Sequence, residues 1–254
     1  IRADKIGQII SGQVYWNSAG VWVKERQENQ TEMEYQMRNW YYFNWLCGDH
    51  IVEQHIHNID VANWFIGEFP VHAQGMGGRE VRKGKEYGQI FEHHFVEFTY
   101  PSGAVISSQC RHQKGCLDNV SESLMGTKGK IYLDSQNKGI ITGYNGTKIY
   151  EHQGANDPNP YQTEHDVLFD SIKNGGVISD AEHAAKTTMT AILGRMATYS
   201  GQLITFEDAL NKGRSLMPDE YSWDAMPPVT PDADGFYPIP VPGVTKVLEE
   251  KKIN

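Results

Sequence analysis

Acidic and histidine side chains between residues 49 and 60 have the types and spacing that proton transfer requires. Asp49, Glu53, His57 and Asp60 follow one another at intervals of 4, 4 and 3 positions, which places them on one face of a helix. A carboxylate four positions before an imidazole can orient it and raise its basicity, so Glu53 is expected to act on His57. Histidine changes charge near neutral pH, and the pair therefore predicts acid/base chemistry.

Three interpretations of this polar face remain open on pattern alone. The first is an ordinary solvated helix face, because runs of charge usually contact water. The second is a metal site, in which His50, Glu53 and His57 would ligate zinc or manganese, although their spacing is not that of the H-E-x-x-H proteases. The third is the acid/base pair of Glu53 and His57.

The surrounding elements predict an α+β fold. Residues 49–66 form one expected helix, which Gly67 ends. Strands are expected at 6–16, 71–78, 90–100, 104–112, 120–125, 130–134, 140–144 and 147–152. Asn145-Gly146 lies between the last two, and this dipeptide favours a tight hairpin. In 71–78, three glycines indicate a bulge or a close backbone approach.

Helices are expected later in the chain, at 161–173, from Ser179 or Asp180 to Ser200, and at 206–211. Strands followed by helices predict an open, mostly antiparallel sheet with helices on one face. The other face is then expected to form the interface of a homodimer or homotetramer. We predict one domain at 1–216, with a proline-rich arm at 217–254 lying on it.

Composition excludes several classes of protein. The 254 residues carry a net charge of -9, with 22% charged and 39% hydrophobic residues. Nothing forms a basic patch for nucleic acid, and no run of about 18 apolar residues predicts a membrane helix. The cysteines, Cys47, Cys110 and Cys116, are odd in number and lack zinc-type spacing, which argues against a disulfide framework.

A longer set of motifs resembles the Gfo/Idh/MocA oxidoreductases, the family of glucose–fructose oxidoreductase and inositol dehydrogenase. The central match runs from Gly48 to Gly67 and contains an acidic residue, then His57, then Asp60, before a terminal glycine. Further matches are Pro70, residues 73–79, 192–195, 199–201 and 237–243. The chain resembles the C-terminal, substrate-binding and oligomerising domain of that family.

The resemblance implies roles for individual residues. His57 would be the acid/base for the substrate hydroxyl, and Glu53 would occupy the position where the family usually has Asp. Asp49 occupies a position where a third glycine is common, which would bring a carboxylate and His50 close to the substrate. Weaker candidates for binding substrate are Tyr35, Arg38, Arg111, His112 and His165.

The resemblance also implies a cofactor and a substrate. NAD or NADP would be bound mainly by a Rossmann domain, but neither G-x-G-x-x-G nor the family's Glu-Lys-Pro motif occurs here. Since the chain begins at Ile1 without Met, we expect it to be the later part of a longer protein. It would contain no cofactor-binding residues of its own, and alone it would be inactive.

The expected function is therefore the substrate-binding part of an NAD(P)-dependent oxidoreductase of a sugar, sugar derivative or cyclitol. A metal-dependent lyase or isomerase and a non-catalytic sugar-binding or subunit-association module are the alternatives. No nucleic-acid or membrane partner is expected. A bacterial protein is expected, cytoplasmic or, if a preceding segment carries an export signal, periplasmic.

Overall fold

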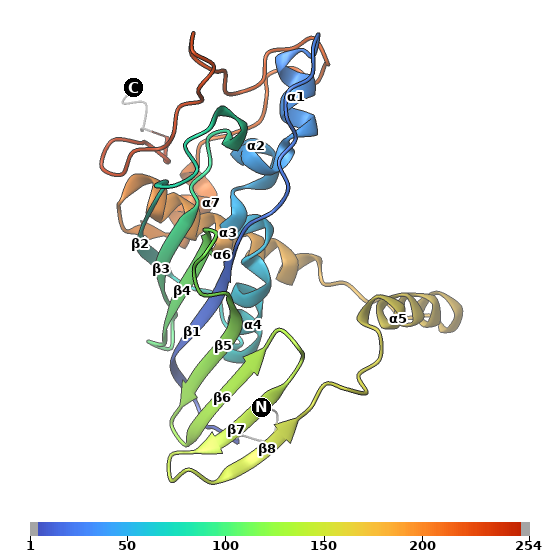
Figure 1. The fold of residues 1–254 in the computed structure, drawn as a ribbon. Coiled ribbons are helices and arrows are strands. Elements are labelled where there is room, and N and C mark those ends of the chain that lie inside the picture. Colours follow the sequence, from blue (N-terminus) through green and yellow to red (C-terminus); the bar gives the residue numbers. More distant parts are fainter. Residues whose placement is uncertain (1–4, 250–254) are drawn as a thin grey trace.

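The computed structural model describes residues 5–249, which form an open nine-stranded sheet with helices against one face (Figure 1). The strands lie in the order β8-β7-β6-β5-β1-β4-β3-β2-β9. They are β1 Ile9–Ser18, β2 His72–Gly78, β3 His93–Thr99, β4 Val105–His112, β5 Asn119–Gly126, β6 Gly129–Asp134, β7 Gly139–Gly143, β8 Lys148–His152 and β9 Ile204–Thr205. Every pairing is antiparallel except that of β1 with β4. The predicted α+β class and its mostly antiparallel sheet are confirmed.

The helices are α1 Glu32–Arg38, α2 Asn44–Cys47, α3 His50–Glu53, α4 Ile56–Ile66, α5 Pro160–Asn174, α6 Ala181–Ser200 and α7 Phe206–Lys212, with 3₁₀ turns η1 Trp40–Tyr42 and η2 Lys85–Tyr87. In Figure 1, α3, α4 and α6 cover the same face of the sheet. The main core lies between these layers and includes Val14, Val96, Phe98, Ile106 and Leu124, each at most 1% exposed.

The glycines of β2 allow a close approach of backbone to backbone. The strand pairs with β3 in an unbroken register, so the predicted bulge is absent and the predicted close approach is present. A Cβ on Gly75 would lie 2.4 Å from the carbonyl oxygen of Phe95 and 3.1 Å from Cγ2 of Thr198. Glycine at this position therefore lets α6 pack against the sheet.

The long segment between β1 and α3 is ordered around aromatic side chains. Tyr35, Tyr41, Tyr42 and Phe43 are buried in a second core. Tyr237 joins this core from the C-terminal segment, and its ring lies 4.9 Å from that of Phe43. The aromatic residues of this segment thus fix its shape and hold part of the C-terminal segment.

Helix α5 stands apart from the rest of the fold. It projects to one side in Figure 1, and none of its residues is buried. Its apolar side is uncovered, because Leu168, Phe169 and Ile172 are more than half exposed.

All three cysteines are free; Cys47 and Cys110 are buried and Cys116 is exposed. In the described part of the chain, no helix is both long and apolar enough to cross a membrane.

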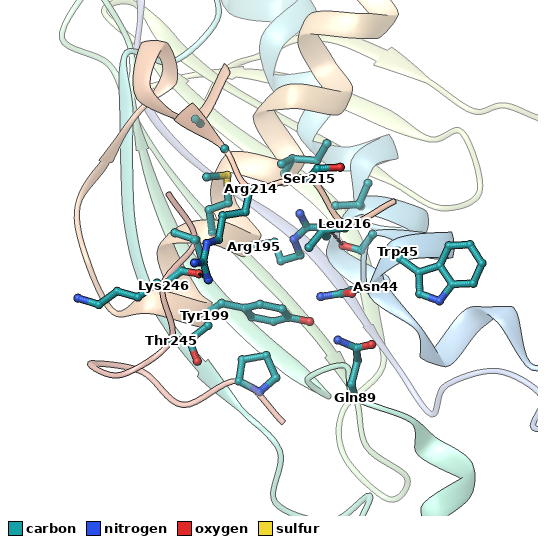
Figure 2. Close-up of a pocket in the computed structure, with 18 of the residues that line it drawn as sticks. Asn44, Trp45, Gln89, Arg195, Tyr199, Arg214, Ser215, Leu216, Thr245 and Lys246 are labelled. Atoms are coloured by element: carbon teal, nitrogen blue, oxygen red, sulfur yellow. Dashed lines mark hydrogen bonds between the residues drawn. The ribbon is translucent and has the colours of Figure 1, made fainter. Parts of the chain in front are cut away.

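A cavity of about 890 Å³ lies between α6, α2 and the C-terminal segment (Figure 2). We call it the α6 cavity. Arg195 and Tyr199 reach it from α6, Asn44 from α2, and Thr245 and Lys246 from the C-terminal segment.

The close packing at Gly75 generates a test. Gly75→Ala places a methyl group against the β3 backbone and α6, and we expect the free energy of unfolding to fall by about 1–3 kcal/mol. Gly176→Ala is the matched control, because its Cβ would meet only Ser171 Oγ at 3.8 Å. Urea denaturation of both variants checks this, and equal stabilities would contradict the packing described.

Candidate functional site

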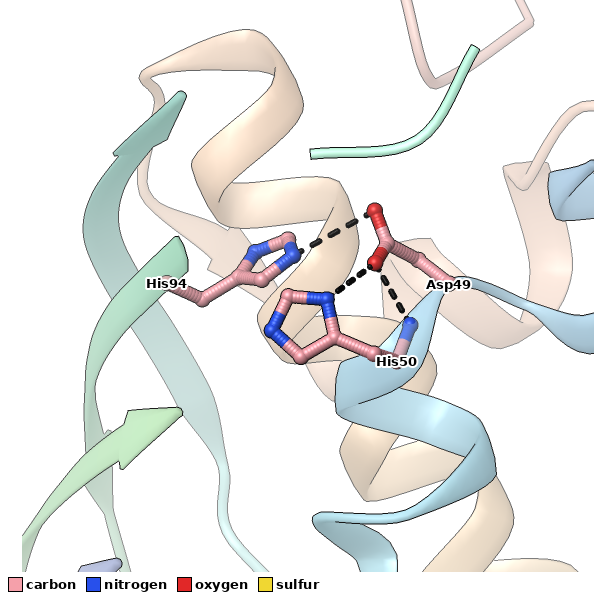
Figure 3. Close-up of side chains that lie close together, drawn as sticks. All are labelled: Asp49, His50 and His94. Carbon is pink, nitrogen blue, oxygen red and sulfur yellow. Dashed lines mark hydrogen bonds and ion pairs between the residues drawn. The ribbon is translucent and has the colours of Figure 1, made fainter. Parts of the chain in front are cut away.

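The carboxylate of Asp49 lies at the centre of a buried polar cluster (Figure 3). Its Oδ1 accepts a hydrogen bond from His50 Nδ1 at 2.8 Å. Its Oδ2 accepts from the backbone N–H of Phe91 at 2.9 Å and from the Tyr199 hydroxyl at 2.6 Å. His94 Nε2 lies 3.3 Å from the same oxygen. This Asp49 cluster (Asp49, His50, His94 and Tyr199) joins α3, β3 and α6.

The backbone of Asp49 is in a conformation that usually requires glycine. Its φ is 75° and its ψ is 160°, at the N-cap of α3. A side chain held in this region costs on the order of 1–3 kcal/mol. The resemblance places glycine here, and the geometry explains why. Asp49 is retained in this conformation by the hydrogen bonds that its carboxylate accepts.

Burial and the histidines oppose each other in setting the charges of the cluster. Burial raises the pKa of Asp49, but interaction with His94 and hydrogen bonds from His50 and His94 outweigh it, so the pKa is well below its usual value. Burial lowers the pKa of His50, and its hydrogen bond to Asp49 partly offsets this. Because an ionised carboxylate can only accept, Nδ1 of His50 carries the proton. Its Nε2 is buried and has no hydrogen-bond partner among residues 5–249.

The predicted metal set is not brought together. His50 is fully buried whereas His57 is exposed. Among residues 5–249, the one group whose ligand atoms approach closely is Asp49, His50 and His94, with those atoms within 4.8 Å of one another. The 2.8 Å separation of Asp49 Oδ1 and His50 Nδ1 is that of a direct hydrogen bond.

The single helix predicted at 49–66 is wrong, because the chain breaks it between α3 and α4. The N–H of His55 bonds to the carbonyl of His50, and the N–H of His57 bonds to that of Gln54. The His55 side chain turns inward, where its Nε2 lies 2.7 Å from Ser108 Oγ. Because this contact gives the His55 imidazole a polar partner, the ring can be buried at the break.

The break separates the four residues predicted to share one face. Asp49 is buried in its cluster, and Asp60 instead bonds His183 Nε2 and Thr187 Oγ1, each at 2.7 Å. Glu53 and His57 remain neighbours that interact electrostatically.

Glu53 and His57 are the part of the predicted site whose surroundings favour chemistry. Burial raises the pKa of the half-buried Glu53, while the Tyr41 hydroxyl and the charges of His57 and His50 partly oppose that rise. His57 is exposed at the start of α4, with its ring centre 5.9 Å from that of Trp16. An accessible imidazole with a half-buried carboxylate beside it can take up and release a proton.

The two β4 candidates, Arg111 and His112, lie on opposite faces of the sheet. Neighbouring residues of β4 point to opposite faces of the sheet. His112 is buried on the helix side, where its ring lies 4.5 Å from that of His50 and burial lowers its pKa to about 2. Arg111 points to the open face and donates to the carbonyl of Leu117.

The other predicted substrate residues lie elsewhere. Tyr35 is buried in the second core, with its ring against Phe43. Arg38 is exposed and donates to the carbonyl of Glu25 at 2.7 Å. His165 lies on the projecting α5, where its Nδ1 is 2.7 Å from the carbonyl oxygen of Tyr161.

Sequence reasoning missed His94, Tyr199, Tyr41 and Trp16 as parts of these clusters. For His94 a signal existed, because strand alternation places it on the same face as Val96 and Phe98. No sequence signal links Tyr199 to Asp49, since they are 150 positions apart.

Comparison with known proteins identifies a family. The profile of the Gfo/Idh/MocA group, described as "Oxidoreductase family, C-terminal alpha/beta domain", matches residues 1–219. No protein of curated function matches the sequence.

Solved structures share the fold at low sequence identity. An aldose-aldose oxidoreductase from Caulobacter crescentus, complexed with glycerol, gives a TM-score of 0.62 at 15% identity, over 80% of this chain and 57% of that one. A levoglucosan dehydrogenase complexed with NADH and levoglucosan gives a TM-score of 0.59 at 15% identity, over 81% of this chain and 60% of that one. An oxidoreductase from Thermotoga maritima gives a TM-score of 0.59 at 17% identity, over 80% of this chain and 57% of that one. The chain thus spans less than two thirds of these proteins.

The buried histidines generate a test of stability against pH. Burial lowers the pKa of His55 to about 3 and that of His112 to about 2. Below pH 6.5 the unfolded chain therefore binds protons that the folded chain does not. The stabilising contribution of these two neutral histidines is complete above pH 6.5. It is lost as the pH falls towards their pKa values in the folded protein. With about 1.4 kcal/mol per pH unit for each group, unfolding free energy should fall by roughly 2–3 kcal/mol per unit between pH 6 and 5.

Urea denaturation at a series of pH values measures this slope. His55→Gln should remove one group's share of it, about 1.4 kcal/mol per pH unit. His152→Gln should leave it unchanged, because the partly exposed His152 lies at the end of β8, outside the core, and pairs with Asp157. A flat stability profile between pH 6 and 5 would show that these histidines are charged in the folded protein.

Proposed function

Because this chain belongs to the Gfo/Idh/MocA oxidoreductase family as its C-terminal α/β domain, we propose that it binds the substrate of an NAD(P)-dependent oxidoreductase. The substrate would be a sugar, a sugar derivative or a cyclitol, with one hydroxyl group as the reacting group. The observation that carries this proposal is the pairing of exposed His57 with half-buried Glu53 at the break between α3 and α4.

The proposed chemistry of this chain is proton transfer. The imidazole of His57 accepts the hydroxyl proton as the carbinol is oxidised and returns it in the reverse direction. The Glu53 carboxylate favours the imidazolium that forms, and Trp16 restricts the ring of His57. The half-burial of Glu53 strengthens its interaction with His57 relative to a fully solvated carboxylate.

Two of the similar structures support a sugar-like substrate. One is described as an aldose-aldose oxidoreductase complexed with glycerol, and the other as a levoglucosan dehydrogenase complexed with NADH and levoglucosan. The partly buried ring of Trp16, close to His57, offers an apolar surface to the face of a sugar ring.

The described residues do not fit a dinucleotide cofactor. A pyrophosphate cradle needs a glycine-rich turn that leads from a strand into a helix. Here the glycine-rich segment, Gly75 to Gly78, lies within β2 and is paired with β3 along its length. We therefore propose that the nicotinamide cofactor is held by residues outside this chain.

Substitution of His57 tests the proposed acid/base. In the complete natural protein, His57→Ala should lower kcat by about 10²–10⁴-fold, and Glu53→Gln should shift the pH profile of kcat. Turnover is measured with NAD or NADP on D-glucose, myo-inositol and levoglucosan. His152→Ala is the matched histidine control and should keep full activity. Unchanged turnover in His57→Ala would favour a non-catalytic binding module.

Calorimetric titration tests the location of the cofactor site. The 254-residue chain should bind NAD with a Kd weaker than about 1 mM, because its glycine-rich segment is a paired strand. Micromolar binding to this chain would refute the assignment of the cofactor to residues outside it.

A further inference from the structure

The α6 cavity has a positive lining in a chain whose net charge is -9. Among residues 5–249, the cations that line it are Arg195, Arg214 and Lys246, and the one carboxylate is that of Glu249. Glu53 and His57 are not among them. The cavity is therefore a feature that the proposed proton transfer does not use.

Arg195 is the strongest indication of a ligand. This residue is only 8% exposed, and its side chain lines the cavity (Figure 2). Its one hydrogen bond is from Nη1 to the carbonyl oxygen of Gly48 at 3.2 Å, and within residues 5–249 it forms no ion pair. A buried charge without a counterion is costly, and an anion in the cavity would supply that counterion.

The other cations approach the cavity from the segments that close it. Arg214 follows α7 and donates to the carbonyl oxygen of Lys246 at 3.4 Å, which links α7 to the C-terminal segment. Both side chains are exposed and can move onto a ligand. Together with Arg195 they surround the cavity with donors suited to an oxyanion.

Neutral polar groups in the lining indicate that the ligand also carries hydroxyls. Gln89 is buried, and its Oε1 has no hydrogen-bond partner in the described structure. Asn44 lines the same cavity, and Figure 2 shows it close to Gln89. Amide groups both donate and accept, as sugar hydroxyls do. Ile192 and Pro238 supply apolar lining, and the volume of about 890 Å³ accommodates a small organic molecule.

We propose that the α6 cavity binds a hydroxylated organic anion, a sugar that carries a carboxylate or a phosphate group. Arg195 pairs with the anionic group, Arg214 and Lys246 close over it, and Gln89 and Asn44 bond the hydroxyls. The ligand also contacts Tyr199, whose hydroxyl donates a hydrogen bond to Asp49. This second site is independent of the proposed oxidoreductase reaction.

Calorimetry with D-gluconate, glucose 6-phosphate and D-glucose tests the proposal. We expect one or both anions to bind, and D-glucose to bind at least tenfold more weakly because it lacks the charge. Preference for gluconate identifies a carboxylate ligand, and preference for glucose 6-phosphate a phosphate ligand. Affinity should decrease with added salt. Binding of D-glucose that equals that of the anions and is weakened by the α6-cavity variants, or no binding of either anion at about 10 mM, would overturn the proposal.

Variants locate the binding. Arg214→Gln and Lys246→Gln change exposed side chains, so both should fold, and each should weaken the anion about tenfold. Arg195→Gln should weaken it further. Lys173→Gln, an equal loss of charge on the remote α5, should leave affinity unchanged. Full affinity in a variant that carries both Arg214→Gln and Lys246→Gln would place the anion elsewhere and refute the site.

Discussion

The Asp49 carboxylate is the interaction on which the arrangement of this fold depends. It is fully buried, and it accepts hydrogen bonds from α3, from the segment before β3 and from α6. Each of these groups would be left unpaired in the interior without it, and the carboxylate would be equally costly without them. The unfavourable backbone conformation of Asp49 is stable only because this network is complete. The start of α3 is therefore fixed from within the core.

That constraint explains why Glu53 and His57, the pair proposed for proton transfer, lie further along the chain than Asp49. His50 and His55 turn inward to satisfy buried partners, and the helix breaks where the second of them turns. The same break leaves His57 exposed and Glu53 half-buried. The buried histidines and the accessible one thus have different surroundings, although they are close neighbours in sequence.

The sequence predicted the elements that follow from local rules. Apolar alternation and turn residues gave the strands and the β7–β8 hairpin, and the motif at 48–67 gave the family. Local rules could not predict the break at His55, because it depends on Ser108, a partner far away in the chain. Tyr199 and His94 reach Asp49 only through the tertiary fold, so its cluster could not be read from spacing.

The central position of β1 has a consequence for synthesis of the chain. This strand is the first made, yet both of its neighbours come much later, since Ser11 pairs with Val105 on one side and with Met125 on the other. At about 5–20 residues per second, a ribosome would need roughly 5–20 s to supply them. During that interval Ile9 and Val14, which end up in the core, have no sheet to join. The slow step in folding is then closure of the sheet around its oldest strand, and a chaperone that holds exposed strands would act at this stage.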